Sequence, residues 1–143
     1  MMIRTFELKK RTTGDTDILD LTDEVAAMVA ESDVTHGQVL VFTPGSTAAI
    51  TTIEFEAGVI RDLKQAIERM APRDMHYDHD ARWGDGNGYS HVRSALVGGS
   101  FTVPVVDGRL VLGTWQQIVL LDFDNHGRQR RVVVQVTGEG RGA

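Results

Sequence analysis

Closely spaced strand-like segments fill the C-terminal part of the chain, and they constrain the fold more than any other feature of the sequence. The first two flank Asp107-Gly108, a residue pair typical of a two-residue hairpin turn. Short turns of this kind join neighbouring antiparallel strands. We therefore predict a C-terminal antiparallel meander with strands at residues 101–106, 109–112, 115–123 and 130–136.

The N-terminal part predicts two more strands and a helix. The pattern over residues 3–8 indicates an opening strand with an imperfect two-residue period. The acidic, cap-forming stretch 20–24 precedes Val25–Val29, which predicts a first helix. The continuous apolar run Val39–Phe42 is typical of a strand that is covered on both faces.

The main helix is predicted from a capping pattern and an apolar face. Thr51 and Glu54 have the spacing of a capping box, in which each side chain satisfies a free backbone amide of the first turn. Pro72 predicts the end of the helix. The apolar face consists of Val59, Leu63, Ile67 and Met70.

Together these elements predict an α+β fold, because strands and helices do not alternate strictly. We expect a single-domain antiparallel β-sandwich with helices packed on one face. The 143 residues match the usual size of one domain, and no repeat or linker divides them, so residues 1–143 are expected to form that domain. With 41% hydrophobic and 24% charged residues, the composition is that of a globular protein.

Composition also excludes several classes of function. The chain has no cysteine, which excludes disulfides, thiolate metal sites and cysteine nucleophiles. Its net charge of −5 disfavours general nucleic-acid binding, which needs a basic face. No apolar run approaches the roughly 20 residues that cross a bilayer, and the N-terminus lacks a signal-peptide core. We therefore expect a cytoplasmic protein that binds neither nucleic acid nor membrane.

Most side chains suited to chemistry lie between residues 74 and 93, which predicts a long loop leading into a short helix over 91–97, capped by Ser90. His79 and His91 are near enough in the chain to meet across this loop. Two imidazoles with a carboxylate would suit Zn²⁺ or another divalent ion. Alternatively, His79 held by an aspartate is a general acid–base pair. The competing interpretation is that these histidines are exposed or only hydrogen-bond the backbone.

Other patterns have a functional and a structural interpretation. Residues 44–52 carry hydroxyls and a glycine that could bind a phosphate, although an ordinary helix cap explains them better. Trp115, flanked by Thr114 and Gln116, could stack on a heteroaromatic ring, or it could be a core tryptophan. Arginines near the last strand could meet phosphates, although arginines in solvent at a turn are commoner: Arg128, Arg130 and Arg131.

Two blocks of residues give the chain a specific resemblance. Ser100 to Ile118 has the pattern S-x-x-V-x-V-x-x-G-x(4)-G-T-W-Q-x-I. Before it stand Tyr77-x-His79-Asp80, Asn87-Gly88 and Ser90-His91-Val92. In these blocks, and in the order of its elements over nearly the whole chain, the sequence resembles the YjbQ-like family, also called the secondary thiamine-phosphate synthase family.

The resemblance implies a compact α+β sandwich that assembles as a homotrimer, with a polar pocket near the subunit contacts. It also implies a weak, secondary activity that joins hydroxymethylpyrimidine pyrophosphate to thiazole phosphate and releases pyrophosphate. His79 and His91 are implied as the polar centre. The residues implied around them are Glu54, Asn87, Thr114, Trp115 and Gln116.

The chain departs from the family that it resembles at possible metal ligands. Many relatives carry His-Thr before the main helix, where this chain has Pro44-Gly45-Ser46-Thr47. Some relatives have histidine where Tyr89 stands. A three-histidine metal site would therefore lack one or two ligands here, unless Asp80 or Glu54 substitutes.

Three functional hypotheses follow. In the first, an enzyme without an organic cofactor acts on a phosphorylated heterocycle: Trp115 stacks on the ring, Arg109 or Arg130 neutralises phosphate, and Mg²⁺ bridges the pyrophosphate leaving group. The residues expected to be catalytic are His79, His91 and Asp80. In the second, His79, His91 and a carboxylate hold a metal such as Zn²⁺ in a hydrolase or a metal-binding module. In the third, a non-enzymatic trimer binds or senses a small phosphorylated metabolite.

Overall fold

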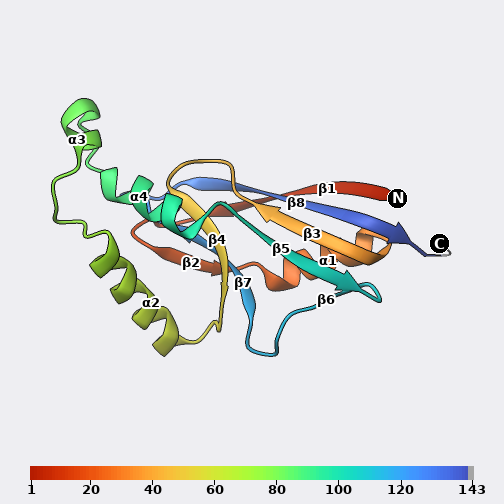
Figure 1. The fold of residues 1–143 in the computed structure, drawn as a ribbon. Helices are drawn as coiled ribbons and strands as arrows, with labels where there is room; N and C mark the ends of the chain where they lie inside the picture. The colour runs from red at the N-terminus through yellow and green to blue at the C-terminus, as the bar shows by residue number, and fades with distance from the viewer. Residues whose placement is uncertain (142–143) are drawn as a thin grey trace.

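Two antiparallel β-sheets form the framework of residues 1–141, the part of the chain that the computed structural model describes (Figure 1). The five strands of the larger sheet follow the order β1 (Met2–Arg11), β8 (Gln129–Gly140), β3 (Val34–Phe42), β5 (Ser100–Val106) and β6 (Arg109–Leu110). The three strands of the smaller sheet follow the order β2 (Asp17–Asp20), β7 (Gln117–Asp122) and β4 (Ala48–Ile53). The α+β class and the antiparallel sandwich are therefore confirmed.

The main core lies between the two sheets, because alternate side chains of each strand point toward the opposite sheet. Val39, Val103 and Val134 of the larger sheet are buried in one cluster with Ile50 and Leu120 of the smaller sheet. Full burial of one such side chain contributes about 1.5–3 kcal/mol. The core thus holds the two sheets in one arrangement and fixes the positions of the loops at their ends.

Within the described residues the sheets carry four helices: α1 (Thr22–Ser32), α2 (Ala57–Met70), α3 (Asp78–Trp83) and α4 (Gly88–Val97). Helix α1 contributes Val25 and Val29 to the main core. Helix α2 contributes Ile67 to a second cluster, on the other face of the smaller sheet. Helix α4 packs against β4, and α3 extends from the same end of the molecule (Figure 1). No helix of this described part is long and apolar enough to cross a lipid bilayer.

The predicted start of the main helix is wrong. Thr51 lies in β4, opposite Val119 of β7, and α2 begins only at Ala57. Its cap is Glu56, whose carboxylate accepts hydrogen bonds from the backbone amides of Gly58 and Val59. Tertiary pairing with β7 overrides the local capping pattern, because the β-branched residues before Glu54 fit a strand as well as a helix start.

The predicted meander is also wrong, although its first hairpin is confirmed. Asp107 and Gly108 both have positive φ angles, of 52° and 74°, as a tight hairpin turn requires. After the two-residue strand β6, however, the chain crosses to the smaller sheet as β7 and returns to the larger one as β8. Nor is the run Val39–Phe42 covered on both faces: Val39 and Val41 are buried, but Phe42 is 42% exposed. Among residues 1–141, no helix covers the outer face of the larger sheet.

Candidate functional site

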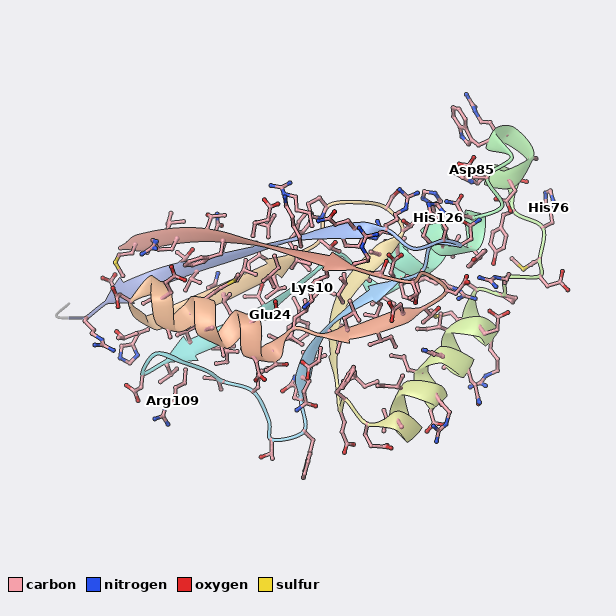
Figure 2. The ribbon with its side chains drawn as sticks, turned by 180° about the vertical axis from the view of Figure 1, so that it is seen from behind. Lys10, Glu24, His76, Asp85, Arg109 and His126 are labelled. Carbon is pink, nitrogen blue, oxygen red and sulfur yellow. The ribbon has the colours of Figure 1, made fainter. Side chains whose placement is uncertain are left out.

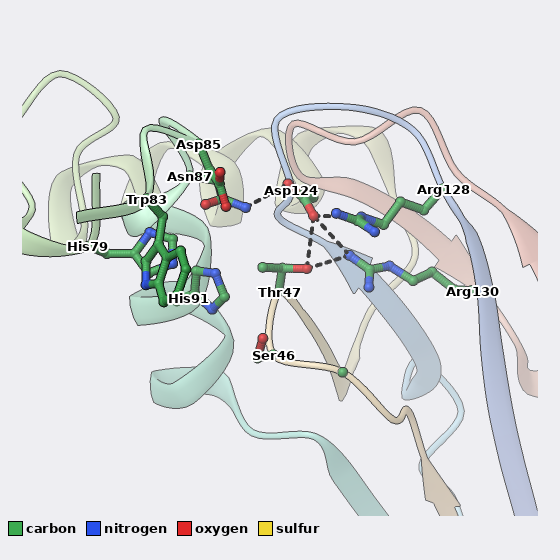
Figure 3. A pocket seen from close by; sticks show the side chains of 11 residues that line it. Ser46, Thr47, His79, Trp83, Asp85, Asn87, His91, Asp124, Arg128 and Arg130 are labelled. Atoms are coloured by element: carbon green, nitrogen blue, oxygen red, sulfur yellow. Dashed lines mark hydrogen bonds and ion pairs between the residues drawn. The ribbon is translucent and has the colours of Figure 1, made fainter. Parts of the chain in front are cut away.

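A polar pocket of about 500 Å³ opens at the end of the sandwich where β7 leads into β8 (Figure 3). Three separate segments contribute side chains to it: the loop between β3 and β4, the helices α3 and α4 with their connection, and the turn from β7 to β8. The lining residues are Gly45, Ser46, Thr47, His79, Trp83, Asp85, Asn87, His91, Asp124, Arg128 and Arg130. Only the folded chain brings these segments together.

His79 and His91 form a close pair in this pocket. Their ring centroids lie 4.4 Å apart, and the ring planes are tilted by 41°. His79 belongs to α3 and His91 to the start of α4, and both rings face the pocket from the same side (Figure 3). The structure therefore brings together the two imidazoles that the sequence suggested as a functional centre.

Side-chain anchors hold the two short helices, and with them the histidines, in place. The region expected to be a loop forms α3, and α4 begins at Gly88 with Asn87, not Ser90, at its cap position. The Ser90 hydroxyl instead donates to the carbonyl of Phe123, just after β7. Asp80 accepts the backbone amide of Gly88 at 2.8 Å, which ties α3 to α4. Helices this short are unstable alone, so these contacts fix the geometry of the pair.

Among the described residues, two buried polar atoms at the pocket have no hydrogen-bond partner: Nδ1 of His79 and Oδ1 of Asn87. A carboxylate oxygen of Asp80 approaches Nδ1 of His79 at 3.5 Å, but the geometry is not that of a hydrogen bond. The expected pairing of His79 with Asp80 is thus a contact within ion-pair range. Because a buried polar atom without a partner costs free energy, both atoms are places where a ligand could be recognised.

Asp124 lies at the centre of the polar network and is fully buried. Its carboxylate accepts hydrogen bonds from the side chains of Asn87, Thr47 and Arg128 and from the backbone amide of Asn125. Burial raises the pKa of this carboxyl, but the hydrogen bonds outweigh burial and lower its pKa to about 2. Asp124 therefore stays ionised near neutral pH and orients the groups that surround it.

A second buried ion pair supports the same wall. Arg130 donates two hydrogen bonds to Asp122, each 2.8 Å long, and a third to the Thr47 hydroxyl at 2.7 Å. Burial alone would raise the pKa of Asp122. The hydrogen bonds from Arg130 and Thr12 have the larger combined effect, so the pKa of Asp122 is lowered. The two hydrogen bonds between Asp122, at the end of β7, and Arg130, at the start of β8, thus hold the plane of the Arg130 guanidinium beside the pocket.

An indole lies in the pocket, but it is not the predicted one. Trp83, the last residue of α3, lines the pocket with both histidines and is 63% exposed. Trp115 lies in a different hollow, together with Glu54 and Phe55. Within one chain Trp115 therefore does not lie beside the imidazoles, and its stacking on a substrate ring stays a prediction.

Of the other residues that the resemblance implies, one lies in the polar pocket and three lie at the opposite end of the smaller sheet. Asn87 lines the pocket, whereas Thr114 and Gln116 precede β7 and Glu54 follows β4. The six residues of β7 separate these positions from the pocket by roughly 20 Å, at about 3.3 Å per residue. Within one chain these residues do not surround the histidines, and their role in substrate binding stays a prediction.

The two predicted phosphate-neutralising arginines lie at opposite ends of the molecule. Arg130 lines the pocket, but Arg109 follows the hairpin turn between β5 and β6 (Figure 2). Figure 2 shows Arg109 far from Asp85 and His126, which mark the pocket end. Of the two alternatives, Arg130 is therefore the arginine placed to neutralise phosphate at the histidines. Within one chain Arg109 lies away from them, because β5 runs away from the pocket.

Sequence reasoning passed over several residues of the site. The sequence patterns gave no functional role to Asp124 or Trp83, and they placed Thr47 in a helix cap. Asp122 ends the apolar strand β7 and Asp124 follows it, and a buried carboxylate needs a partner. That pattern was the available signal for the arginine network at the start of β8.

The described part of the chain, residues 1–141, holds no cluster of three histidine, aspartate or glutamate side chains that could bind a metal ion. His79 and His91 alone converge, and Asp80 is occupied by the amide of Gly88. Glu54, the other suggested substitute, lies in the separate hollow beside Trp115. Two imidazoles are fewer than the three protein ligands usual for a catalytic Zn²⁺.

Fold and site together define a class: an α+β protein of two antiparallel sheets with a histidine- and arginine-lined pocket at one end. The sequence matches the family described as "UPF0047 protein YjbQ-like" over residues 5–139. The chain belongs to this family.

Relatives cover almost its whole length. A UPF0047 protein from Archaeoglobus fulgidus is 40% identical over 129 residues, which are 90% of this chain and 98% of the relative. One from Methanothermobacter thermautotrophicus is 38% identical over 139 residues, or 97% and 95% of the two chains. The crystal structure of a YbjQ-like protein of unknown function from Sulfolobus solfataricus P2 superposes with a TM-score of 0.87 at 28% identity, covering 96% of this chain and 100% of the other.

Proposed function

We propose that this protein is an enzyme that binds a phosphorylated small molecule in the pocket at the β7–β8 end and acts on it with His79 and His91. One observation carries the proposal: two imidazoles 4.4 Å apart share a pocket with two guanidinium groups that have unused N–H donors. Guanidinium groups and imidazoles are the side chains that most often hold phosphate oxygens and transfer protons.

The unused donors follow from the hydrogen bonds of each arginine. Arg128 donates to Asp124 through Nε at 2.6 Å and is half exposed, so its terminal nitrogens face solvent at the pocket. Arg130 uses Nε and one terminal nitrogen on Asp122 and Thr47. Its other terminal nitrogen lies next to Gly45. A Cβ atom at position 45 would lie 3.4 Å from that nitrogen. The glycine thus leaves room for a ligand oxygen beside the guanidinium.

The histidines supply the proton chemistry. A neutral imidazole accepts a proton and an imidazolium donates one, so a pair of rings in contact can hold and pass a proton to a phosphate oxygen that leaves. Asp124 is ionised at all physiological pH values, and its negative charge compensates the positive charge of Arg128. The negative charge of the ligand would then be compensated by Arg130 and the imidazoles. Asn87 Oδ1, without a partner, would accept an N–H or O–H of the ligand.

Resemblance to the secondary thiamine-phosphate synthase family adds a finer proposal. The thiazole-phosphate nitrogen would attack the methylene carbon of hydroxymethylpyrimidine pyrophosphate, the carbon–oxygen bond would break, and pyrophosphate would leave with both electrons of that bond. The arginines and an imidazolium would stabilise the charge on the departing pyrophosphate. Mg²⁺ would arrive with the phosphates, since it is commonly held by substrate oxygens and few protein ligands.

A homotrimer is the proposed assembly, again from the resemblance. Ile3 and Val106, exposed apolar side chains on the outer face of the larger sheet, are compatible with contact between copies. We expect no nucleic-acid or membrane partner. Measuring the mass of the purified protein in solution tests the trimer, and a monomeric mass would refute it.

The enzyme is tested by substituting the histidines one at a time. His79→Ala and His91→Ala should each abolish release of pyrophosphate from hydroxymethylpyrimidine pyrophosphate while the solution mass stays unchanged. His36→Ala is the matched control, because His36 lies on β3 outside the pocket and is exposed. Unchanged turnover in both pocket variants would overturn the assignment. Tight pyrophosphate binding without turnover in the unaltered protein would favour the non-enzymatic ligand-binding hypothesis.

A metal-dependent hydrolase is the second candidate, and the contact between the two imidazoles is what favours it. The third protein ligand that Zn²⁺ usually needs does not come from residues 1–141 of the same copy, so it would have to come from another copy or from the ligand. Metal analysis of protein purified without an affinity tag tests this candidate. Substoichiometric metal that is lost on dialysis would contradict it.

A further inference from the structure

A second hollow of about 490 Å³ adjoins the polar pocket, and the two share Gly45, Ser46 and His91 among their lining residues. The second hollow extends from His91 along α4 toward the start of β5. The rest of its lining is Phe42, Thr43, Ser94, Ala95, Gly98 and Gly99. The His91 ring therefore stands at the boundary between two compartments of one groove.

The second compartment is mostly apolar, because the two hydroxyl groups beyond its boundary with the polar pocket are occupied. The Ser94 hydroxyl donates to the carbonyl of Ala48 at 2.6 Å, and the Thr43 hydroxyl donates to the carbonyl of Arg131 at 3.2 Å. No aspartate, glutamate, lysine or arginine is among its lining residues, and His91 stands only at its boundary with the polar pocket. The exposed ring of Phe42 and the methyl group of Ala95 are left to contact a ligand. This is the opposite of the polar pocket, whose unpartnered atoms require hydrogen bonds.

Two glycines give this compartment a flat wall of backbone. Gly98 has a φ of +100°, a conformation that residues with a side chain rarely adopt, and a Cβ there would meet no atom within 4 Å. The neighbouring Gly99 lies close to the Phe42 ring, at 3.8 Å from the position of a Cβ. The carbonyls of both glycines accept backbone amides, from Ile50 and Thr43, so the wall is rigid.

We propose that this compartment binds the organic part of the phosphorylated ligand, and that this part is an apolar group such as a flat ring. The inference rests on the proposed function, because it places the phosphate in the polar pocket and the rest of the same molecule across His91. Apolar surface removed from water by Phe42, Ala95 and the glycine wall would add to the affinity that the phosphate contacts supply. The compartment then selects aryl phosphates over small or highly polar phosphate esters.

The test compares phenyl phosphate with methyl phosphate, using calorimetric titration of the full chain. Phenyl phosphate should bind about ten-fold tighter or more, because only its ring can reach the apolar compartment. Ala95→Leu fills that compartment from an exposed helix position and should remove the preference while leaving methyl phosphate binding unchanged. Ala27→Leu, at an exposed position of α1, is the matched control and should keep the preference.

The outcomes separate this inference from the proposed function. Equal binding of the two esters by the unaltered protein, or an unchanged preference in Ala95→Leu, would overturn the inference while the phosphate site stands. Binding of neither ester would overturn both. A changed solution mass of Ala95→Leu alone would assign the compartment to contact between copies and would also overturn the inference.

Discussion

The guanidinium of Arg128 and the carboxylate of Asp124 meet at 2.6 Å across the turn that joins the two sheets. Asp124 is fully buried behind the pocket wall, whereas Arg128 is 44% exposed. The pair therefore has one end fixed in the protein interior and one end free to contact a ligand. Because Asp124 also accepts hydrogen bonds from Thr47 and Asn87, one carboxylate orients groups from three segments of the chain.

Replacement of Arg128 should weaken anion binding. Arg128→Gln removes the positive charge and the free N–H donors at the pocket, and a hydrogen bond to a charged group is worth about 1.5–3 kcal/mol. We expect pyrophosphate to bind about 10- to 100-fold more weakly in calorimetric titration. Arg131→Gln is the control, because Arg131 contacts Glu7 on the outer face of the larger sheet. Equal weakening by both variants would mean that only the overall charge matters.

The histidine pair should contribute to turnover more than to binding. A positioned general acid or base accelerates a reaction by about 10²–10⁴-fold. His91→Gln keeps a polar side chain but cannot transfer a proton, so we expect kcat to fall by at least the lower figure while the KM changes little. Steady-state kinetics of pyrophosphate release would measure both constants. A rise in KM alone would show that His91 only binds the ligand.

Stability should fall at acidic pH because Asp124 must be protonated. The folded pKa of Asp124 is lowered from 3.8 to about 2, so the folded protein binds fewer protons there than the unfolded chain. Its contribution to stability is complete above about pH 4 and is lost as the pH falls toward 2. Urea unfolding at a series of pH values should show a smaller acid-dependent loss for Asp124→Asn. Asp62→Asn, at an exposed position of α2, should retain the full loss.

The cap of α2 can be distinguished from the cap that the sequence pattern suggested. Glu56 accepts the amides of Gly58 and Val59, and these hydrogen bonds lower its pKa. Glu56→Ala should therefore lower the melting temperature, because two amides of the first turn lose their acceptor. Glu54→Ala, two positions earlier and equally exposed, should leave it nearly unchanged. A lower melting temperature for Glu54→Ala than for Glu56→Ala would instead support the capping box that begins at Thr51.

Local patterns in the sequence were enough to predict one hairpin, the main helix and the pair of histidines. Asp107-Gly108 determined its hairpin, since few residue pairs adopt positive φ angles without strain. The apolar face at Ile67 determined that α2 would be a helix packed on a sheet. His79 and His91 were identified because imidazole is the side chain that titrates near neutral pH. Each of these conclusions depends on residues close together in the chain.

The tertiary structure decided which of these groups meet. The sequence does not show that the chain leaves the larger sheet to form β7. That crossing separates Trp115 from His91 and places Asp124 beside Asn87 and Thr47, which are distant in the chain. Hydrophobic periodicity identifies the face that a strand buries, but many strand orders would bury the same faces. The partners of a side chain depend on the strand order that packs best, and this is a property of the whole chain.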